Sequence, residues 1–171
     1  MDSLEAIFTR RSIRKYKPDP IPEEDIETML RAAMSAPSAN NYQPWRFIII
    51  DERTLLDAIP EFHPYSEMLK EAPLAILVCG DKTAVGHPGY VYLDCSAATQ
   101  NLLISAHALG LGAVWLGMYP RKSRMDGIRK LLQLSNNLEP ISLISIGYPN
   151  QEKLPANRFD KNKVCRNKWE V

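Results

Sequence analysis

The feature that most limits the fold of this chain is a run of mainly apolar residues from 90 to 118. Four polar residues interrupt the run, and two glycines divide it: Asp94, Gln100, Asn101 and His107, and Gly110 and Gly112. A membrane-spanning helix needs about 20 apolar residues without such charges. We therefore predict a buried helix over 90–109, closed by Gly110, and then a buried strand over 113–116. A helix that is apolar on most faces in a chain of 171 residues indicates that a subunit interface covers it.

The rest of the chain predicts a single α+β domain over residues 1–171. Hydrophobic periodicity predicts further helices over 3–9 (with Ser3 as its cap), 23–35 and 123–132, short helical turns over 54–59 and 66–71, and buried strands over 47–50, 74–79 and 141–147. Prolines make 17–22 an extended connector. Because helices and strands follow one another without regular alternation, the class is α+β.

Charge and cysteine usage exclude several function classes. The formal net charge is +1, from 21 Lys and Arg against 20 Asp and Glu, which gives no electrostatic reason to expect a nucleic-acid or acidic-membrane partner. The N-terminus lacks the basic and apolar regions of a secretory signal. Cys79, Cys95 and Cys165 fit neither a disulfide framework nor a zinc pattern. These features predict a cytoplasmic protein with buried or incidental thiols.

Three segments carry the candidate chemistry. Arg10-Arg11-Ser12-Ile13-Arg14 suits a phosphate, because guanidinium groups bind oxygen atoms bidentately and Arg10 and Arg14 would lie side by side on one helical turn. The amide and hydroxyl side chains within 37–45 suit the edge of a polar ring. The glycines of 110–117 allow a backbone to approach a flat ligand closely. Taken singly, the arginines are better explained as a solvated helix end and the polar residues as a turn, and the glycine segment is equally compatible with a plain strand end.

Together, in this order and spacing, the three segments resemble the nitroreductase family of flavin mononucleotide (FMN) enzymes over nearly the whole chain. The resemblance implies a mixed central sheet flanked by helices, and a homodimer in which a C-terminal arm, about 150–171, extends onto the partner subunit. It places Arg10, Arg11 and Ser12 at the flavin phosphate and ribityl chain, and Arg14 at the pyrimidine edge of the ring. Arg158 resembles a late phosphate-binding residue of the family, with Lys161 and Lys163 as nearby alternatives.

The other two segments match residues that lie beside the flavin ring in the family. The polar loop is expected to reach a flavin held mainly by the other subunit, through Pro37, Ser38, Asn40, Asn41 and Gln43. Ala39 departs from the family pattern, where a polar residue is frequent. Leu116 and Gly117 match a segment whose backbone lies beside the isoalloxazine, where a backbone N–H near N5 would tune hydride acceptance.

The resemblance implies an FMN-dependent oxidoreductase that uses NAD(P)H to reduce a small electron-poor acceptor of nitroaromatic or quinone type. No glycine-rich dinucleotide fingerprint is present, which favours ping-pong hydride transfer over a two-site dehydrogenase. No catalytic side chain is expected, because flavin N5 carries the chemistry, and the histidines have no metal-ligand spacing. Two alternatives stay open: a flavin carrier or redox sensor without steady turnover, and a family relative that performs flavin fragmentation or reductive dehalogenation. The acceptor and the choice between NADH and NADPH also stay open.

Overall fold

A computed structural model gives the fold of the protein and describes residues 1–169. Nine regular elements occur in these residues: α1 (Ser3–Thr9), α2 (Glu23–Met34), β1 (Trp45–Ile50), α3 (Arg53–Ala58), β2 (Leu74–Asp81), α4 (Gly89–Ala108), β3 (Gly112–Gly117), α5 (Lys122–Leu131) and β4 (Leu138–Gly147). Short 3-10 helices add Ala39–Asn41, Ile59–Glu61, Glu67–Lys70 and Lys161–Lys163. The sequence predicted all nine regular elements and the turn at Glu67–Lys70, with boundaries that differ by a few residues, but not the other three 3-10 helices.

The strands form one four-stranded sheet in the order β1-β2-β4-β3. All three strand pairs are antiparallel. The α+β class is therefore confirmed. The expectation of a mixed sheet was wrong, because the strands of this sheet pair only in the antiparallel sense. Within residues 1–169, the parallel pairing is limited to an isolated bridge between Ser12 and Ala113. Strand β3 consequently lies at an edge of the sheet, next to the segment that carries the N-terminal arginines.

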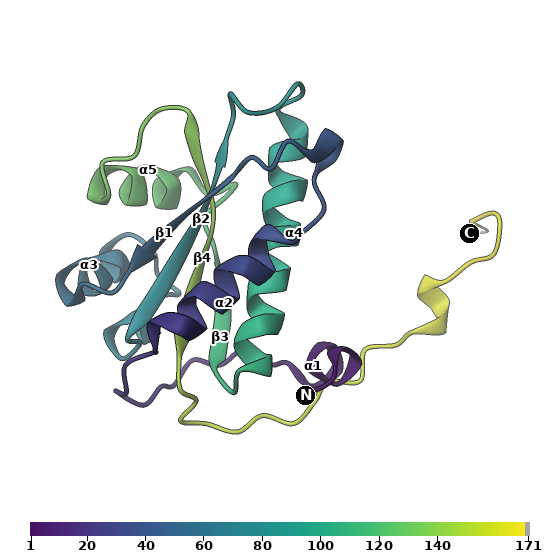
Figure 1. Ribbon diagram of the computed structural model, residues 1–171, viewed down its shortest axis with the longest axis horizontal. Helices are drawn as coiled ribbons and strands as arrows, with labels where there is room; N and C mark the ends of the chain where they lie inside the picture. The colour runs from purple at the N-terminus through teal and green to yellow at the C-terminus, as the bar shows by residue number, and fades with distance from the viewer. Residues whose placement is uncertain (170–171) are drawn as a thin grey trace.

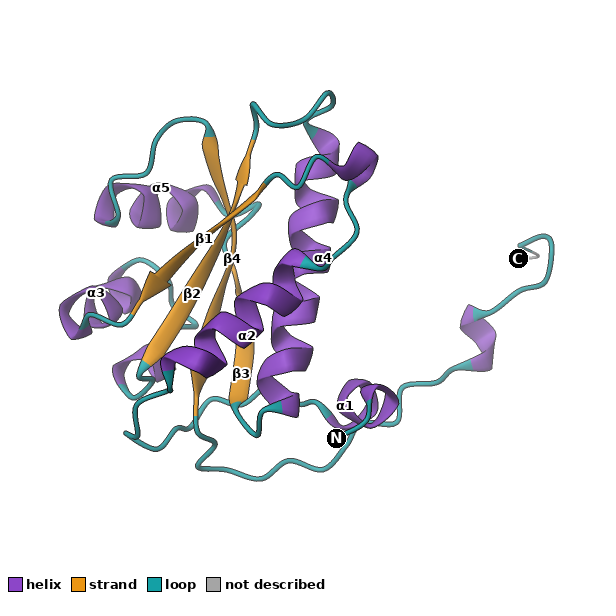
Figure 2. Cartoon of the chain, in the orientation of Figure 1, coloured by secondary structure: helices purple, strands orange, loops and turns teal. Residues whose placement is uncertain are grey.

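Helices cover both faces of the sheet, with α2 and α4 on one side and α3 and α5 on the other (Figures 1 and 2). Strand β2 is buried throughout, and its residues alternate between the two cores. Ile76 and Val78 belong to the core beneath α2 and α4, whereas Leu77 and Cys79 belong to the core beneath α3 and α5. This alternation follows from the two-residue period of a strand, so both faces need apolar side chains.

Helix α4 is the buried helix that the long apolar run predicts. Eight of its side chains are buried, including that of Asp94, while Tyr90 and Leu93 stay exposed. Gly110 follows the helix with a φ of 79°, the left-handed conformation that favours glycine. Within residues 1–169, no helix is long and apolar enough to cross a membrane.

The first helix begins with a different cap from the one expected. Asp2, not Ser3, caps α1, because its carboxylate accepts the backbone N–H groups of Leu4 and Glu5 at 2.8 and 3.0 Å. Helix α1 packs against α4 through the buried Ala6. Its larger apolar side chains, Leu4, Ile7 and Phe8, remain exposed.

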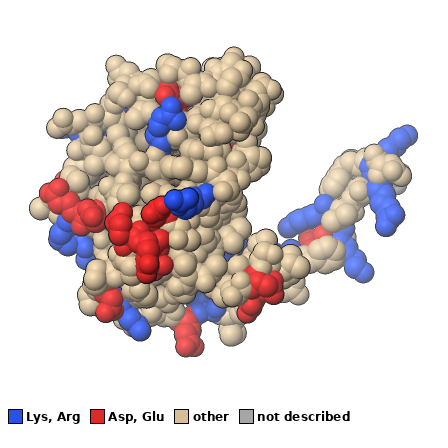
Figure 3. Space-filling model, in the orientation of Figure 1, with Lys and Arg blue, Asp and Glu red and all other residues tan. Residues whose placement is uncertain are grey.

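The two ends of the chain run together along the edge of the sheet. Tyr16 forms an isolated bridge with Pro149, and the Lys15 carbonyl accepts the Asn150 N–H at 2.9 Å. Beyond this point the C-terminal segment passes α1 and extends away from the body of the protein (Figure 1). Lys and Arg side chains gather along this extension (Figure 3). They are Lys153, Arg158, Lys161, Lys163, Arg166 and Lys168.

Gly112 fixes the N-terminal segment against β3. A Cβ atom at this position would lie 2.6 Å from Ile13 Cγ2 and 2.8 Å from Ile13 Cβ. We expect Gly112→Ala to lower the free energy of unfolding by about 1–3 kcal/mol, because overpacking a close contact forces backbone shifts. Chemical denaturation of the two proteins measures the difference. An unchanged free energy of unfolding would show that Ile13 moves aside freely.

Candidate functional site

A group of arginines gathers between α1 and the C-terminal segment. Arg10 and Arg158 line a cavity of about 510 Å³ together with apolar side chains that include Phe8 and Phe159. Burial of the Arg10 guanidinium, followed by the charges of Arg158 and Arg11, lowers the pKa of Arg10 below its ordinary value. Among residues 1–169, none of these arginines forms an ion pair with a carboxylate. Three close cations without a counterion favour an anionic ligand.

The C-terminal segment is tied to this group by two basic side chains. Arg11 Nη1 donates a hydrogen bond to the Leu154 carbonyl. Lys153 Nζ donates to the Ser12 carbonyl at 2.9 Å. These contacts hold residues 153–158 against the N-terminal arginines and bring Arg158 to Arg10. Lys161 and Lys163 are exposed on the next short helix, and Lys163 Nζ lies 3.8 Å from Asp160 Oδ2. Of the three basic residues that the sequence left open, Arg158 is the one that reaches the cavity.

The expectation that Arg10 and Arg14 lie side by side on one helical turn was wrong. Helix α1 ends at Thr9, and Arg10, at its C-terminal cap, has an extended ψ of 131°. The Ile13 N–H then donates to the Ala113 carbonyl at 3.1 Å, so residues 11–14 run along β3. Arg10 and Arg14 therefore line two different cavities.

The second cavity, which we call the β3-end cavity, has a volume of about 400 Å³. It brings Arg14, Leu116 and Gly117 together, as expected, and adds His63, Tyr65, Trp115 and Arg124. The Gly117 carbonyl accepts hydrogen bonds from Arg124 Nη1 at 2.8 Å and from His63 Nε2 at 3.2 Å. Because the N–H and C=O of a strand residue point to the same side, the Gly117 N–H also points off the free edge of β3.

His63 serves this cavity as a neutral group. Its Nδ1 accepts the Tyr65 N–H at 3.4 Å, so its Nε2 carries the proton that it donates to Gly117. Burial, followed by the charge of Arg124, lowers the pKa of His63. The sequence indicated 60–68 and 120–125 as segments that shape the choice of substrate in the family, but it singled out neither His63 nor Arg124 within them. They are 61 residues apart in the sequence and come together because each donates a hydrogen bond to the Gly117 carbonyl. No local sequence pattern indicates such a contact.

The polar loop has an unusual backbone. Asn40, Asn41 and Gln43 have φ values of 48°, 56° and 49°, and non-glycine residues rarely adopt this left-handed conformation. The loop is held by the Ala39 N–H, which donates to Asp94 Oδ1 at 3.2 Å, and internally by Gln43 Nε2, which donates to Asn41 Oδ1 at 2.8 Å. Three strained positions in one exposed loop motivate a functional role.

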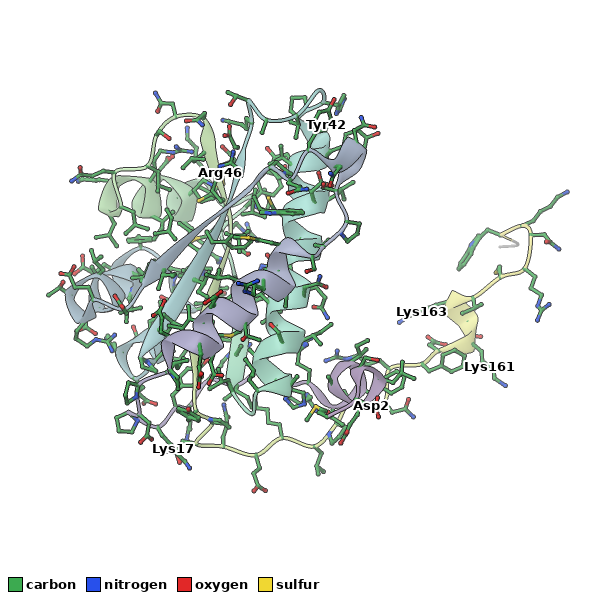
Figure 4. All side chains as sticks on the ribbon, in the orientation of Figure 1. Asp2, Lys17, Tyr42, Arg46, Lys161 and Lys163 are labelled. Carbon is green, nitrogen blue, oxygen red and sulfur yellow. The ribbon has the colours of Figure 1, made fainter. Side chains whose placement is uncertain are left out.

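Within one chain, the loop does not meet the arginines. Figure 4 shows Tyr42 of the loop at the N-terminal end of α4, whereas Asp2 of α1 lies near its opposite end. Pro37 and Asn40 are exposed at that end, and Ser38 is half-buried. The structure thus separates the expected site residues: Arg10 and Arg158 line the arginine cavity, Arg14, Leu116 and Gly117 line the β3-end cavity, and the polar loop lies apart. Arg11 lines a further cavity together with Thr9 and Leu154.

The two cavities, joined by residues 10–14, suit a small molecule that carries an anionic group. Comparison with known proteins gives the class. The model of the nitroreductase family matches residues 7–64 and 61–148. A protein of Methanothermobacter thermautotrophicus, provisionally named NADH dehydrogenase/NAD(P)H nitroreductase, is 48% identical over 169 residues, which cover 99% of this chain and 88% of that protein.

Solved structures agree with this match. A crystal structure of a protein with the same provisional name from Parabacteroides distasonis has a TM-score of 0.94 and 43% identity over 98% of each chain. A provisionally named nitroreductase from Desulfovibrio desulfuricans, solved in complex with FMN, has a TM-score of 0.86 and 31% identity over 99% of each chain. The chain belongs to the nitroreductase family. Membership confirms the predicted class, an FMN-type oxidoreductase.

Proposed function

We propose that the protein is an FMN-dependent oxidoreductase that takes a hydride from NAD(P)H and delivers it to an electron-poor acceptor of nitroaromatic or quinone type. The observation that carries this proposal is the group of arginines between α1 and the C-terminal segment, which have no carboxylate partner among residues 1–169, in a chain of this family. A relative of similar length was solved with FMN bound. When bound, FMN supplies a ring that accepts and releases a hydride at N5.

The arginine cavity fits the phosphate of that cofactor. Arg10 and Arg158 line it, whereas Arg11 lines a neighbouring cavity that shares Pro155 with it. Ser12 follows Arg11 in the chain and has a half-buried side chain. Guanidinium matches the geometry of phosphate oxygens and keeps its charge even where burial lowers its pKa. We assign phosphate and ribityl binding to these four residues.

The β3-end cavity fits the flat ring. The backbone at Leu116 and Gly117 faces the cavity without a large side chain at Gly117, where an added Cβ would meet nothing within 4 Å. The Gly117 N–H points off the edge of the sheet, which suits a hydrogen bond to a ring nitrogen. Arg14 lies in the same cavity, and a fixed cation there stabilises negative charge on the pyrimidine edge.

Two copies of the chain complete the proposed site. We propose a homodimer in which Pro37, Ser38, Asn40, Asn41 and Gln43 of one copy reach the FMN held mainly by the other. The separation between the loop and the arginines within one chain supports this arrangement. Exposed apolar side chains on α1, α4 and the C-terminal segment supply surface for the interface. The three cysteines are free and two are buried, in keeping with the proposed cytoplasmic location.

Steady-state turnover tests the proposed activity. The flavin-loaded protein should oxidise NADH or NADPH when menadione or nitrofurazone is present. The nucleotide that it oxidises should also reduce the bound flavin under anaerobic conditions before an acceptor is added. A fully flavinated protein that does not turn over with either nucleotide would instead be a carrier or sensor.

Arg14 should affect the redox potential more than cofactor affinity. We expect Arg14→Gln to lower the flavin midpoint potential by roughly 30 mV, which for two electrons is about 1.4 kcal/mol, near the low end for a hydrogen bond to a charged group. The reason is that negative charge on the reduced ring loses its neighbouring cation. Potentiometric titration measures the shift, with Arg31→Gln on α2 as the control. An unchanged midpoint potential would remove Arg14 from this role.

A further inference from the structure

Arg124 is the one basic side chain of the β3-end cavity that the cofactor assignment does not use. It comes from α5, whereas Arg14 comes from the N-terminal segment. Among residues 1–169, Arg124 forms no ion pair with a carboxylate. Glu67 also lines the cavity, but Lys70 Nζ lies 2.8 Å from its carboxylate and offsets its charge. The cavity therefore carries net positive charge.

The Arg124 guanidinium is fixed in place by two contacts. Its Nη1 donates to the Gly117 carbonyl at 2.8 Å. Its Cζ lies 5.3 Å from the centroid of the Tyr65 ring, within the range of a cation–π interaction. A guanidinium has five N–H donors, so the bond to Gly117 leaves others available. A half-buried, preoriented fork of this kind binds an anionic group with less loss of side-chain entropy than a free surface arginine.

The rest of the cavity wall suits an aromatic molecule. Trp115 and Tyr65 expose 37% and 69% of their surfaces beside Arg124, and Met68 adds a further apolar contact. His63 makes the other hydrogen bond to the Gly117 carbonyl, and burial lowers its pKa, which favours a neutral ring that does not compete for an anion. Aromatic faces next to one oriented cation favour a flat ligand that carries a carboxylate, sulfonate or phosphate.

We propose that Arg124 is a specificity-determining residue, which binds an anionic group of the molecule that exchanges hydride with the cofactor. The proposal rests on the proposed function for its role in turnover, whereas the anion site itself consists only of residues of this chain. Two sources offer the required chemistry: an aromatic acceptor with an anionic substituent, or the 2′-phosphate of NADPH.

Equilibrium binding to the oxidised holoprotein tests the proposal without turnover. Calorimetry compares 4-nitrobenzoate with its neutral isostere 4-nitrobenzamide, and NADP⁺ with NAD⁺. We expect the protein to prefer the anionic member of at least one pair by about five- to tenfold, a reasonable value for one charge-assisted hydrogen bond at a partly exposed site. The pair that shows the preference identifies the source of the anion.

Variants of α5 assign the preference to one side chain. Arg124→Gln should abolish the preference for the anionic ligand. Arg124→Lys keeps the charge but loses the planar guanidinium, so it should retain only part of that preference. Lys130→Gln removes one charge from the exposed side of the same helix and should leave it intact. Equal affinities within both pairs, or a preference that survives in Arg124→Gln, would overturn the proposal.

The test of the anion site at Arg124 can fail or succeed independently of the test of the proposed FMN-dependent activity. A preparation that contains no flavin, as its absorbance would show, counts against the proposed cofactor. The same titrations on that apoprotein still test the anion site when the parent protein is compared with Arg124→Gln, because Arg14 of the same cavity is present in both. A ratio of affinities also cancels any general loss of binding that a variant causes.

Discussion

Arg10→Ala and Arg158→Ala are each expected to weaken FMN binding by about ten- to a hundredfold, the loss of one hydrogen bond between charged groups. Both side chains line the arginine cavity, and neither has a carboxylate partner among residues 1–169. The fold should survive, because removing one of three close cations relieves repulsion in the flavin-free protein. Fluorescence titration of the apoprotein with FMN gives the affinities.

Lys161→Ala is the matched control for Arg158→Ala. Lys161 lies three residues further along the same segment and is exposed. The Lys161→Ala protein should bind FMN as tightly as the parent protein does. If both arginine variants keep their flavin through gel filtration at sub-micromolar protein, the phosphate assignment is wrong. If Lys161→Ala alone loses flavin, the basic residue was misassigned within the C-terminal segment.

Deleting the residues after Pro149 should abolish the dimer and FMN binding together. This segment contains Leu154, Phe159, Val164 and Trp169, which expose 85%, 75%, 63% and 65% of their surfaces in the single chain. Several exposed apolar side chains on one extended segment favour contact with another surface, because covering them removes apolar area from water. Obligate dimer interfaces bury more than about 2,000 Å², so losing the arm removes a large part of the expected contact.

A shorter deletion separates the arm from the arginine contacts. Truncation after Phe159 keeps the Arg11–Leu154 and Lys153–Ser12 hydrogen bonds and Arg158 itself. If the dimer shares its flavin sites, this protein should still lose dimer and flavin in parallel. A monomeric truncated protein that binds FMN normally would show that the arginine cavity suffices and that the polar loop plays no part. Gel filtration with detection at the flavin absorbance measures both properties.

Local sequence patterns predicted the elements but not their ends or their tertiary contacts. Apolar periodicity located α4 and β2 because a buried helix and a buried strand each need continuous apolar residues. It did not locate the end of α1, where the pairing of Ile13 with Ala113 extends the chain directly after Thr9. The helical spacing of Arg10 and Arg14 failed for that reason.

The candidate site was predictable where its residues lie in one segment. Arg10, Arg11 and Ser12 are consecutive in the sequence, and Arg158 joins Arg10 in one cavity through a segment that Lys153 holds. Long-range contacts such as those of Arg124 and His63 with Gly117 depend on how α5 and the 59–70 segment pack at the end of β3. No local spacing encodes that packing.

The most direct test of the shared FMN site is light scattering of the purified holoprotein with simultaneous absorbance at the flavin bands. A shared site predicts a yellow particle with twice the mass of the 19.4 kDa chain and one FMN per chain. A 19.4 kDa monomer that retains its FMN and oxidises NADH would contradict the shared site.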